Sequence, residues 1–439
     1  MGLAGAPTDS DRPGEAGSMA IDELITRAGA SERKRRILEL NHEYLMPNRV
    51  QSWLGAGIPL VIAKREGYRL WDVDGAELQD FHLNGGTYNL GHRHPVLLEA
   101  LLEALETLDV GNHHFPSEAR GLLAEKLARL TPGDLHYSVF TPSGSEANDV
   151  AIKSARRATG RRKTVTFEMG FHGTSGLSGA AGEDTNARFF NSDFPDDFLR
   201  IPFNDLEALE TALRGRDVAA FLAEPLPATF GFPVPDAVYW PAARKLCDEY
   251  GTLLIADEVQ TGLGRSGSMW AIEALGAEPD MLITGKGLAG GLYPIGCVVM
   301  TRRVGEWLNE NGWGYVSTFG GAEIGCYVAS RVLDLTVAEE TTSAVKENGA
   351  YLRQGLESLQ DRYSYLCDIR QMGVIFGLGF DDPAGGMKMA RALYKAGLWA
   401  MFAGFDRRYL QFKLGLLVDK PYCDEALGKL ETALKAVTG

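Results

Sequence analysis

The chain has 439 residues, of which 45% are hydrophobic and 23% charged, and its formal net charge is −14. This composition is typical of a globular protein with a sizeable core, and the acidic balance argues against nucleic acid as a partner. Every apolar run is shorter than the roughly 18 residues that suggest a membrane-spanning helix. We therefore expect neither a nucleic-acid-binding protein nor a membrane protein.

The cysteines are scattered and follow no paired spacing: Cys247, Cys297, Cys326, Cys367 and Cys423. Such an arrangement argues against a disulfide framework and against a metal site, and it is typical of a reducing compartment. We expect a cytoplasmic protein that binds no metal. Residues 1–20 are rich in Gly, Pro, Asp and Ser and lack the pattern of a signal peptide, so we expect them to form a disordered tail.

The first expected elements form a small N-terminal region. A helical pattern covers Ile21–Asn48, and short strands with turns follow at Leu60–Ala63 and Gly67–Phe81. Helices are then expected at Pro95–Leu108 and Ser117–Leu130, the second with Ser117 as its N-cap.

The centre of the chain alternates short apolar strands with helices. The expected strands are Tyr137–Phe140, Thr164–Phe167, Ala219–Ala223, Leu253–Ala256, Met281–Thr284 and Cys297–Met300. A helix at Trp240–Tyr250 ends at Gly251, a typical C-cap residue. Apolar strands separated by helices predict a mostly parallel sheet that is covered by helices on both faces.

The last hundred residues follow a different pattern. A helix begins near Ser343, short strands follow at Gly373–Phe380 and Tyr409–Leu417, and a last helix begins near Asp424. We predict an α/β protein with a large domain at residues 95–340. Residues 21–94 and 341–439, the N- and C-terminal parts, would together form a smaller α+β domain.

Ionisable residues follow two of the central strands. Asp257 and Glu258 come directly after one strand, and Lys286 follows the next within a glycine-rich segment. In open α/β sheets, ligands bind at the carboxyl ends of the strands, and a desolvated lysine can act as a nucleophile toward an aldehyde. The alternatives are an acidic cap on a loop and an ordinary surface lysine.

Two further segments follow strands in the same way. Gly144 and Ser145 lie in a Ser-Gly-Ser turn that opens a helix, where free N–H groups and hydroxyls can bind an anion. Phe171 and His172 follow the strand at Thr164–Phe167, and an aromatic ring there can stack on a planar ligand. Simple helix capping and core packing are the alternatives for these residues.

Together these segments resemble the class III, fold type I aminotransferases that depend on pyridoxal phosphate (PLP). This family includes the ornithine, acetylornithine, 4-aminobutyrate and diamine aminotransferases. The resemblance extends from about residue 60 to 335, and it rests on Gly67-Tyr68, Leu70-Trp71-Asp72, Asp74-Gly75, Asn89-Leu90-Gly91-His92, His94-Pro95, Glu224-Pro225, Leu253–Gly262, Gly264-Arg265, Gly267 and Gly285-Lys286. It implies the fold type I PLP-transferase architecture, PLP as the cofactor, and ping-pong transfer of an amino group from an amine or amino-acid donor to an oxo-acid or aldehyde acceptor.

The resemblance also implies roles for the residues near the cofactor ring. Lys286 would form the internal aldimine with PLP and would then move a proton as base and acid. Asp257 would pair with the ring nitrogen, and Gln260 would hydrogen-bond the phenolic oxygen. Phe171 would stack on the ring face.

The phosphate of PLP would be bound by Gly144 and Ser145. Thr318 matches a phosphate contact that family members donate from the neighbouring subunit, which implies a homodimer with shared active sites.

One departure from the family concerns the substrate. Many members carry an arginine before a Pro-Pro-Leu run that clamps the substrate carboxylate. Gln411 occupies that position here, both prolines are absent, and the nearby cations are Arg407, Arg408 and Lys413. Glu224, which pairs with that arginine in some members, is retained as a substrate-binding candidate. The sequence leaves the identity of the amine open.

Three other functions remain as alternatives. An aminomutase of the glutamate-1-semialdehyde type, a racemase or a decarboxylating enzyme could use the same fold without an oxo-acid acceptor. The segment Gly262–Gly267 matches the G-x-G-x-x-G fingerprint of an NAD-dependent oxidoreductase, although Asp257 and Glu258 would crowd a pyrophosphate there. A regulator that binds PLP without turnover would need a DNA-binding segment, and none is recognisable.

Overall fold

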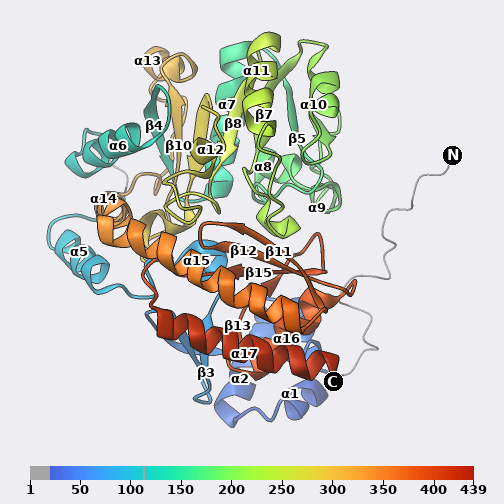
Figure 1. Cartoon of the computed structure of the whole chain (residues 1–439). Coiled ribbons are helices and arrows are strands. Elements are labelled where there is room, and N and C mark those ends of the chain that lie inside the picture. Colours follow the sequence, from blue (N-terminus) through green and yellow to red (C-terminus); the bar gives the residue numbers. More distant parts are fainter. Residues whose placement is uncertain (1–19, 112–113) are drawn as a thin grey trace.

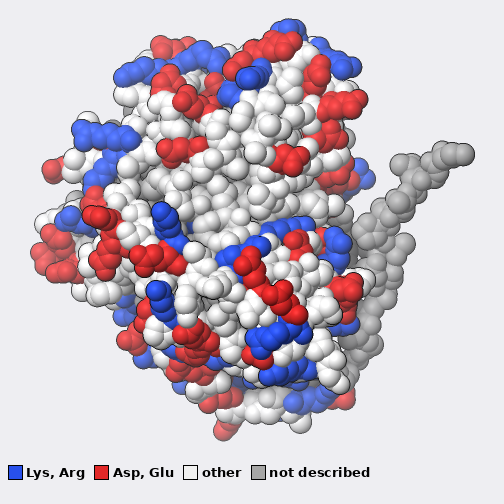
Figure 2. Space-filling model, viewed as in Figure 1, with Lys and Arg blue, Asp and Glu red and all other residues white. Residues whose placement is uncertain are grey.

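The structure is a computed structural model that describes residues 20–111 and 114–439 (Figure 1). The tail predicted at residues 1–20 lies outside the described residues, apart from Ala20. Within the described ranges, no helix combines the length and the apolar character needed to cross a membrane. Acidic and basic side chains are interspersed over the face shown in Figure 2, an arrangement that offers no continuous basic surface there.

A seven-stranded sheet forms the upper half of the molecule in Figure 1, with the order β4-β10-β9-β8-β7-β5-β6. Its strands are β4 (Leu135–Thr141), β5 (Lys163–Phe167), β6 (Phe198–Ile201), β7 (Val218–Ala223), β8 (Leu253–Asp257), β9 (Met281–Thr284) and β10 (Gly296–Thr301). Only β10 runs antiparallel to its neighbours; the other pairs are parallel. The expected mostly parallel sheet is thus confirmed. Strand β6 was not predicted, because Arg200 interrupts its apolar sequence pattern.

Helices cover both faces of this sheet. Alternate residues of β8 point to opposite faces and therefore belong to two different hydrophobic cores. Leu253 and Ile255 of β8 belong to the core beneath helix α7 (Gly144–Thr159), whereas Leu254 and Ala256 belong to the core that includes Trp240 of α11 (Tyr239–Tyr250). The helices of this region are α5 (Pro95–Leu105), α6 (Glu118–Leu130), α7 (Gly144–Thr159), α8 (Gly176–Ala181), α9 (Asp184–Arg188), α10 (Leu206–Leu213), α11 (Tyr239–Tyr250), α12 (Ala271–Ala274), α13 (Trp307–Glu310) and α14 (Glu323–Val337).

Two smaller sheets lie in the lower half of Figure 1. One joins the N- and C-terminal parts in the order β1-β2-β3-β13, from β1 (Ile62–Glu66), β2 (Arg69–Asp72), β3 (Glu77–Asp80) and β13 (Leu398–Trp399). The other has the order β11-β12-β15-β14, from β11 (Leu366–Met372), β12 (Ile375–Phe380), β14 (Met401–Phe402) and β15 (Tyr409–Lys413). The helices here are α1 (Ile21–Arg27), α2 (Glu32–Tyr44), α3 (Pro47–Gly55), α4 (Leu83–Gly86), α15 (Glu339–Arg362), α16 (Gly385–Lys395) and α17 (Lys420–Thr438). The exact domain boundaries stay a prediction.

Several local predictions differ from the structure, and three of them concern where helices begin and how they are capped. The helical pattern at Ile21–Asn48 is divided among α1, α2 and α3, because Gly29 has a φ of 62° and the Ser31 hydroxyl caps α2. Ser117 precedes α6, but its side chain makes no capping hydrogen bond. The last helix begins at Lys420, four residues early, because Asp419 accepts a hydrogen bond from the backbone N–H of Tyr422.

Phe81 links the two chain parts of the smaller region. Its ring stacks on Phe412 with 4.1 Å between centroids and lies 5.5 Å from Tyr422. We expect Phe81→Ala to lower the free energy of unfolding by about 3–5 kcal/mol, because the change removes a fully buried aromatic ring. Urea denaturation measures this loss. Leu102→Ala, at a site that is 67% exposed, should change it by less than about 0.5 kcal/mol, and an equal effect of both would contradict the prediction.

Candidate active site

The carboxyl ends of the parallel strands meet at a cavity of about 170 Å³. It is lined by Gly144, Ser145, Asn148, Phe171, His172, Gly173, Glu224, Asp257, Val259, Gln260 and Lys286. The structure thus brings together all the residues predicted for one subunit's site. Thr318 is absent from this lining and lies exposed between α13 and α14.

Asp257, the last residue of β8, is 3% exposed and is held by three hydrogen bonds. Its Oδ2 accepts from Nδ1 of His172 at 2.8 Å and from Nδ2 of Asn148 at 3.1 Å. Its Oδ1 accepts from the backbone N–H of Val259 at 3.1 Å. A buried carboxylate is costly without such donors, and these contacts fix it as an oriented negative group in the cavity wall.

Lys286 begins the 3-10 helix η3 (Lys286–Ala289), with only Gly285 between it and the end of β9, and its backbone has a φ of 44°. Burial lowers the pKa of its amine, and the negative charges of Asp257 and Glu224 oppose that change only in part. A lowered pKa increases the fraction of free amine at neutral pH, the form needed in a nucleophile or a base. A side chain at Gly85 would place its Cβ 2.8 Å from Cε of Lys286, so glycine leaves room for the lysine.

Hydroxyl and N–H groups gather at the start of α7. The Ser143 hydroxyl caps the helix by accepting from the N–H of Glu146, which leaves the first helical residues, Gly144 and Ser145, at the edge of the cavity. The hydroxyl of Ser145 lies 2.8 Å from those of Ser175 and Ser178. N–H groups of a first helical turn have no partner within the helix, and together with the helix dipole they favour an anion.

Gln260 and Phe171 lie on other sides of the same cavity. The buried Oε1 of Gln260 has no hydrogen-bond partner among the residues described, so its amide is available to a ligand. Phe171 is half-buried, and its backbone N–H donates to Oε1 of Glu224 at 3.0 Å.

Glu224 is a buried acid beside the catalytic candidates. Its Oε2 accepts from the N–H of Ala228 at 3.1 Å. Burial raises the pKa of Glu224 to about 7, and the negative charge of Asp257 adds to this increase. The Glu224 carboxyl group therefore changes its charge near neutral pH, where most enzymes work.

The raised pKa of Glu224 predicts a change in acceptor binding near pH 7. Above that pH the added negative charge next to Asp257 should weaken binding of an anionic oxo acid, so its KM should rise with pH by about tenfold. In Glu224→Gln the transition near pH 7 should disappear. Steady-state KM between pH 5.5 and 9 measures this, and an unchanged transition in the variant would assign it to another group.

Sequence reasoning did not assign Asn148 a role and left His172 open. Both residues orient Asp257. Asn148 lies one helical turn after Gly144, so a polar side chain on the sheet-facing side of α7 was the signal for it.

The G-x-G-x-x-G match at Gly262–Gly267 forms turns rather than the start of a helix. Within it, the fully buried Arg265 donates hydrogen bonds to the backbone oxygens of Gly86 and Gln260. The segment therefore connects α4 to the site and does not form a dinucleotide-binding turn.

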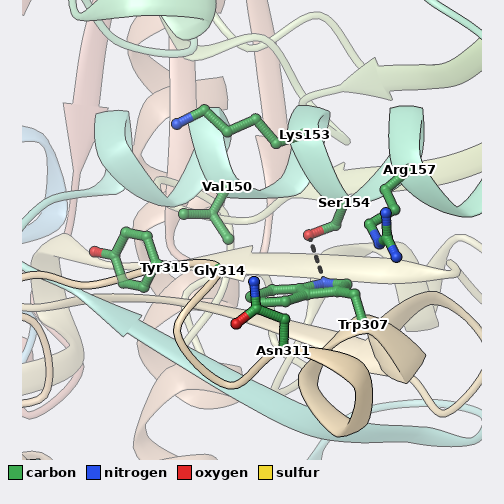
Figure 3. Close-up of a pocket in the computed structure, with 8 residues that line it drawn as sticks. All are labelled: Val150, Lys153, Ser154, Arg157, Trp307, Asn311, Gly314 and Tyr315. Atoms are coloured by element: carbon green, nitrogen blue, oxygen red, sulfur yellow. Dashed lines mark hydrogen bonds between the residues drawn. The ribbon is translucent and has the colours of Figure 1, made fainter.

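A second pocket, of about 250 Å³, lies between α7 and α13 (Figure 3). The indole N–H of Trp307 donates to the Ser154 hydroxyl at 3.2 Å, and Lys153 and Arg157 are at the exposed edge. None of the predicted site residues lines this pocket, and it contains no buried acid or amine. The buried acids and the buried amine therefore line the cavity of about 170 Å³ and not this pocket.

The comparisons with known proteins agree with this geometry. A family model described as aminotransferase class-III matches residues 54–434. The chain belongs to the class III aminotransferases. The match extends well beyond residue 335, into the part of the chain where the resemblance of the sequence is weak.

Among relatives of this aminotransferase, a protein of Archaeoglobus fulgidus that is named an uncharacterized aminotransferase is 42% identical, over 92% of this chain and 94% of its own. An acetylornithine aminotransferase of Vibrio vulnificus is 33% identical, over 86% and 94%. A solved ornithine aminotransferase of Toxoplasma gondii, reported with partial occupancy of PLP at its active site, has a TM-score of 0.84 and 26% identity, over 96% of this chain and 99% of its own.

Enzymes of this family depend on PLP, and PLP is the cofactor of this aminotransferase. The residues present fit it. The cavity offers an oriented carboxylate at Asp257, an unpaired amide at Gln260 and a buried amine at Lys286. The hydroxyls and N–H groups at the start of α7 suit the phosphate. Its substrates are accordingly a small-molecule amine and an oxo acid.

Proposed function

We propose that this aminotransferase moves the amino group of a terminal primary amine to an oxo acid, with Lys286 as the residue that transfers the proton. The observation that carries the proposal is the buried amine of Lys286 in one cavity with the fixed carboxylate of Asp257. Ornithine and acetylornithine, for which two of the similar proteins are named, both carry an amine at the end of a carbon chain.

PLP, when bound, supplies the ring that accepts electrons from the substrate carbon. We assign Asp257 to the ring nitrogen, where its negative charge keeps that nitrogen protonated. Gln260 donates to the phenolic oxygen, and Phe171 covers one ring face. Gly144 and Ser145 hold the phosphate, which fixes the cofactor at its far end.

Lys286 then acts in two ways. As a free amine it removes a proton from the substrate carbon, and as an ammonium it returns that proton on the cofactor side. His172 and Asn148 hold Asp257 in place while charge develops, so the site needs little rearrangement. Because the Lys286 amine is buried, water has little access to the proton that Lys286 transfers.

The ping-pong scheme predicts a defined stoichiometry. With a donor alone, the enzyme should release one aldehyde or ketone per active site, and addition of an oxo acid should restore continuous turnover. Product analysis by mass spectrometry measures both. Continuous turnover without an oxo acid would instead support the aminomutase, racemase or decarboxylase alternatives.

We also propose a cytoplasmic homodimer with shared active sites. Phe115, Trp313 and Val316 are 78%, 65% and 59% exposed and line one hollow near Thr318, which supports an interface there. In this dimer Thr318 reaches the phosphate in the partner's site. The free thiols of all five cysteines are consistent with a reducing compartment.

The shared site predicts complementation between two defective subunits. Thr318→Ala should weaken PLP binding about tenfold, because one hydrogen bond to a charged group is lost. In a hybrid with Lys286→Ala subunits, one site would contain both Lys286 and Thr318 and should regain wild-type affinity for PLP. Fluorescence titration of the mixed protein measures this. Affinity that stays at the Thr318→Ala level would place Thr318 outside the partner's site.

A further inference from the structure

Arg265 is a fully buried cation that binds two separate segments beside the cavity. Its guanidinium group donates to the backbone oxygens of Gln260 at 2.6 Å and Val259 at 3.2 Å. It also donates to the backbone oxygen of Gly86 at 2.7 Å and to Oδ1 of Asn89. A buried cation is costly unless its donors are used, so these hydrogen bonds fix the guanidinium group between the two segments.

The first of these segments is the turn that follows β8. The N–H of Val259 donates to Oδ1 of Asp257 at 3.1 Å, and both Val259 and Gln260 line the cavity. Arg265 therefore holds the backbone that carries the Gln260 amide and one of the three donors to Asp257.

The second segment is α4, whose backbone is left-handed. Residues Leu83–Gly86 have φ values of 50°, 49°, 71° and 90°. The first two carry a Cβ, which makes this conformation unfavourable, so it persists only where neighbouring groups impose it. Asp80 accepts a hydrogen bond from the N–H of Leu83 at 2.8 Å, and Arg265 donates to the oxygen of Gly86. Each end of the strained turn is thus held by a buried side chain.

The two segments meet at the side chain of Lys286. A Cβ at Gly85 would lie 2.8 Å from Cε of Lys286 and 3.4 Å from Oε1 of Gln260. A Cβ at Gly86, the next residue, would lie 2.7 Å from Nη1 of Arg265. Close packing of this kind transmits small displacements, so a shift of α4 or of the Gln260 turn would reach Lys286.

The charge of Arg265 also affects Lys286. Burial lowers the pKa of the Lys286 amine, and the positive charge of Arg265 adds to this decrease, whereas Asp257 and Glu224 oppose it. A nearby cation favours the neutral amine, which is the form that can remove a proton.

We propose that Arg265 is a positioning residue for amino transfer. Its guanidinium fork holds the Val259–Gln260 turn and α4 against each other beside the Lys286 side chain, and this keeps the amine in one place. Arg265 does not line the cavity and acts through these two segments. The inference rests on the proposed function, because Lys286 is the residue that transfers the proton there.

Arg265→Lys tests the proposal, because a single amine cannot reproduce a fork that reaches both segments. We expect single-turnover conversion of bound PLP by a saturating terminal amine to slow by about 10–100-fold, since a misplacement of about 1 Å can cost 10²-fold. The amine concentration that gives half the maximal rate should stay within about threefold, because the loss affects the reacting geometry and not amine binding. Rates are normalised to bound PLP, so a smaller amount of folded protein does not alter them.

Arg161→Lys is the matched control. Arg161 likewise donates to three backbone oxygens, those of Val218, Tyr250 and Gly251, and it lies outside the cavity. This variant should lose stability but keep the rate per bound PLP within about twofold. If Arg265→Lys does not fold, Asn89→Ala removes one acceptor of the fork and should slow the conversion several-fold. An unchanged rate in the variant that is measured would overturn the proposal.

Hydrogen–deuterium exchange of the PLP-loaded proteins provides a readout that does not depend on turnover. Loss of the bond to Gly86 should let α4 open, so the amides of residues 82–89 should exchange at least about tenfold faster in Arg265→Lys and at the wild-type rate in Arg161→Lys. If no amine converts bound PLP in the wild type, the proposed function fails, and exchange still decides whether Arg265 holds α4. Unchanged exchange in Arg265→Lys, or faster exchange with an unchanged conversion rate, would overturn the positioning role.

Discussion

Replacement of Lys286 by alanine is expected to lower the rate of amino transfer by about 10²–10⁴-fold, because positioned proton transfer contributes a factor of that size. The methyl group can neither take nor return a proton, while the contacts of Asp257 and the start of α7 stay in place. Single-turnover conversion of bound PLP by a saturating amine measures the rate without product release.

Lys153→Ala provides the matched control for this experiment. Lys153 is an exposed lysine of α7 that lies outside the cavity. Its loss should leave the rate within about twofold of wild type, since surface changes far from a site seldom affect it. A Lys286→Ala enzyme that keeps more than a tenth of the wild-type rate would show that another group moves the proton.

Asp257→Asn should produce the second large effect. The amide keeps the size of the side chain but removes the negative charge that favours a protonated ring nitrogen, so we expect the half-reaction to slow by about 10³-fold, of the order of other buried charge effects in catalysis. PLP should still bind through the phosphate site. Stopped-flow absorbance of the half-reaction, normalised to bound PLP, gives this rate.

Asp280→Asn makes the same change at another Asp next to the sheet. Asp280 accepts from the N–H of Leu254 and pairs with Arg244, away from the cavity. This variant should lose stability but keep the rate per bound PLP. Equal rates for both variants would mean that Asp257 is a structural carboxylate only.

The central sheet could be predicted because its strands are short apolar runs separated by helices. Each of the six expected strands is present, and the residues at their carboxyl ends, Asp257 and Lys286 among them, meet as parallel topology requires. Local patterns were therefore sufficient for the part of the site that lies on the sheet.

Contacts between distant segments could not be read in the same way. Nothing local indicates that His172 would reach Asp257, or that Gly85 would lie against Lys286. The first contact follows from how the segment after β5 packs across the sheet, and the second from how the N-terminal part packs onto the central region; composition and periodicity specify neither.

Capping residues show a third kind of difference. Ser117 and Ser143 are both serines before a helix, yet only Ser143 accepts a hydrogen bond from the first turn. A cap depends on side-chain direction as well as on residue type. The sequence therefore indicates which serines could cap a helix, and only the structure shows which of them does.

The visible absorbance of the PLP-loaded protein during addition of amine donors tests the central claim most directly. We predict an absorbance band of protein-bound PLP that disappears with one equivalent of a terminal amine such as 5-aminopentanoate and returns on addition of an oxo acid. A band that no amine removes, or no band after incubation with PLP, would contradict the assignment of this cavity as the site of amino transfer.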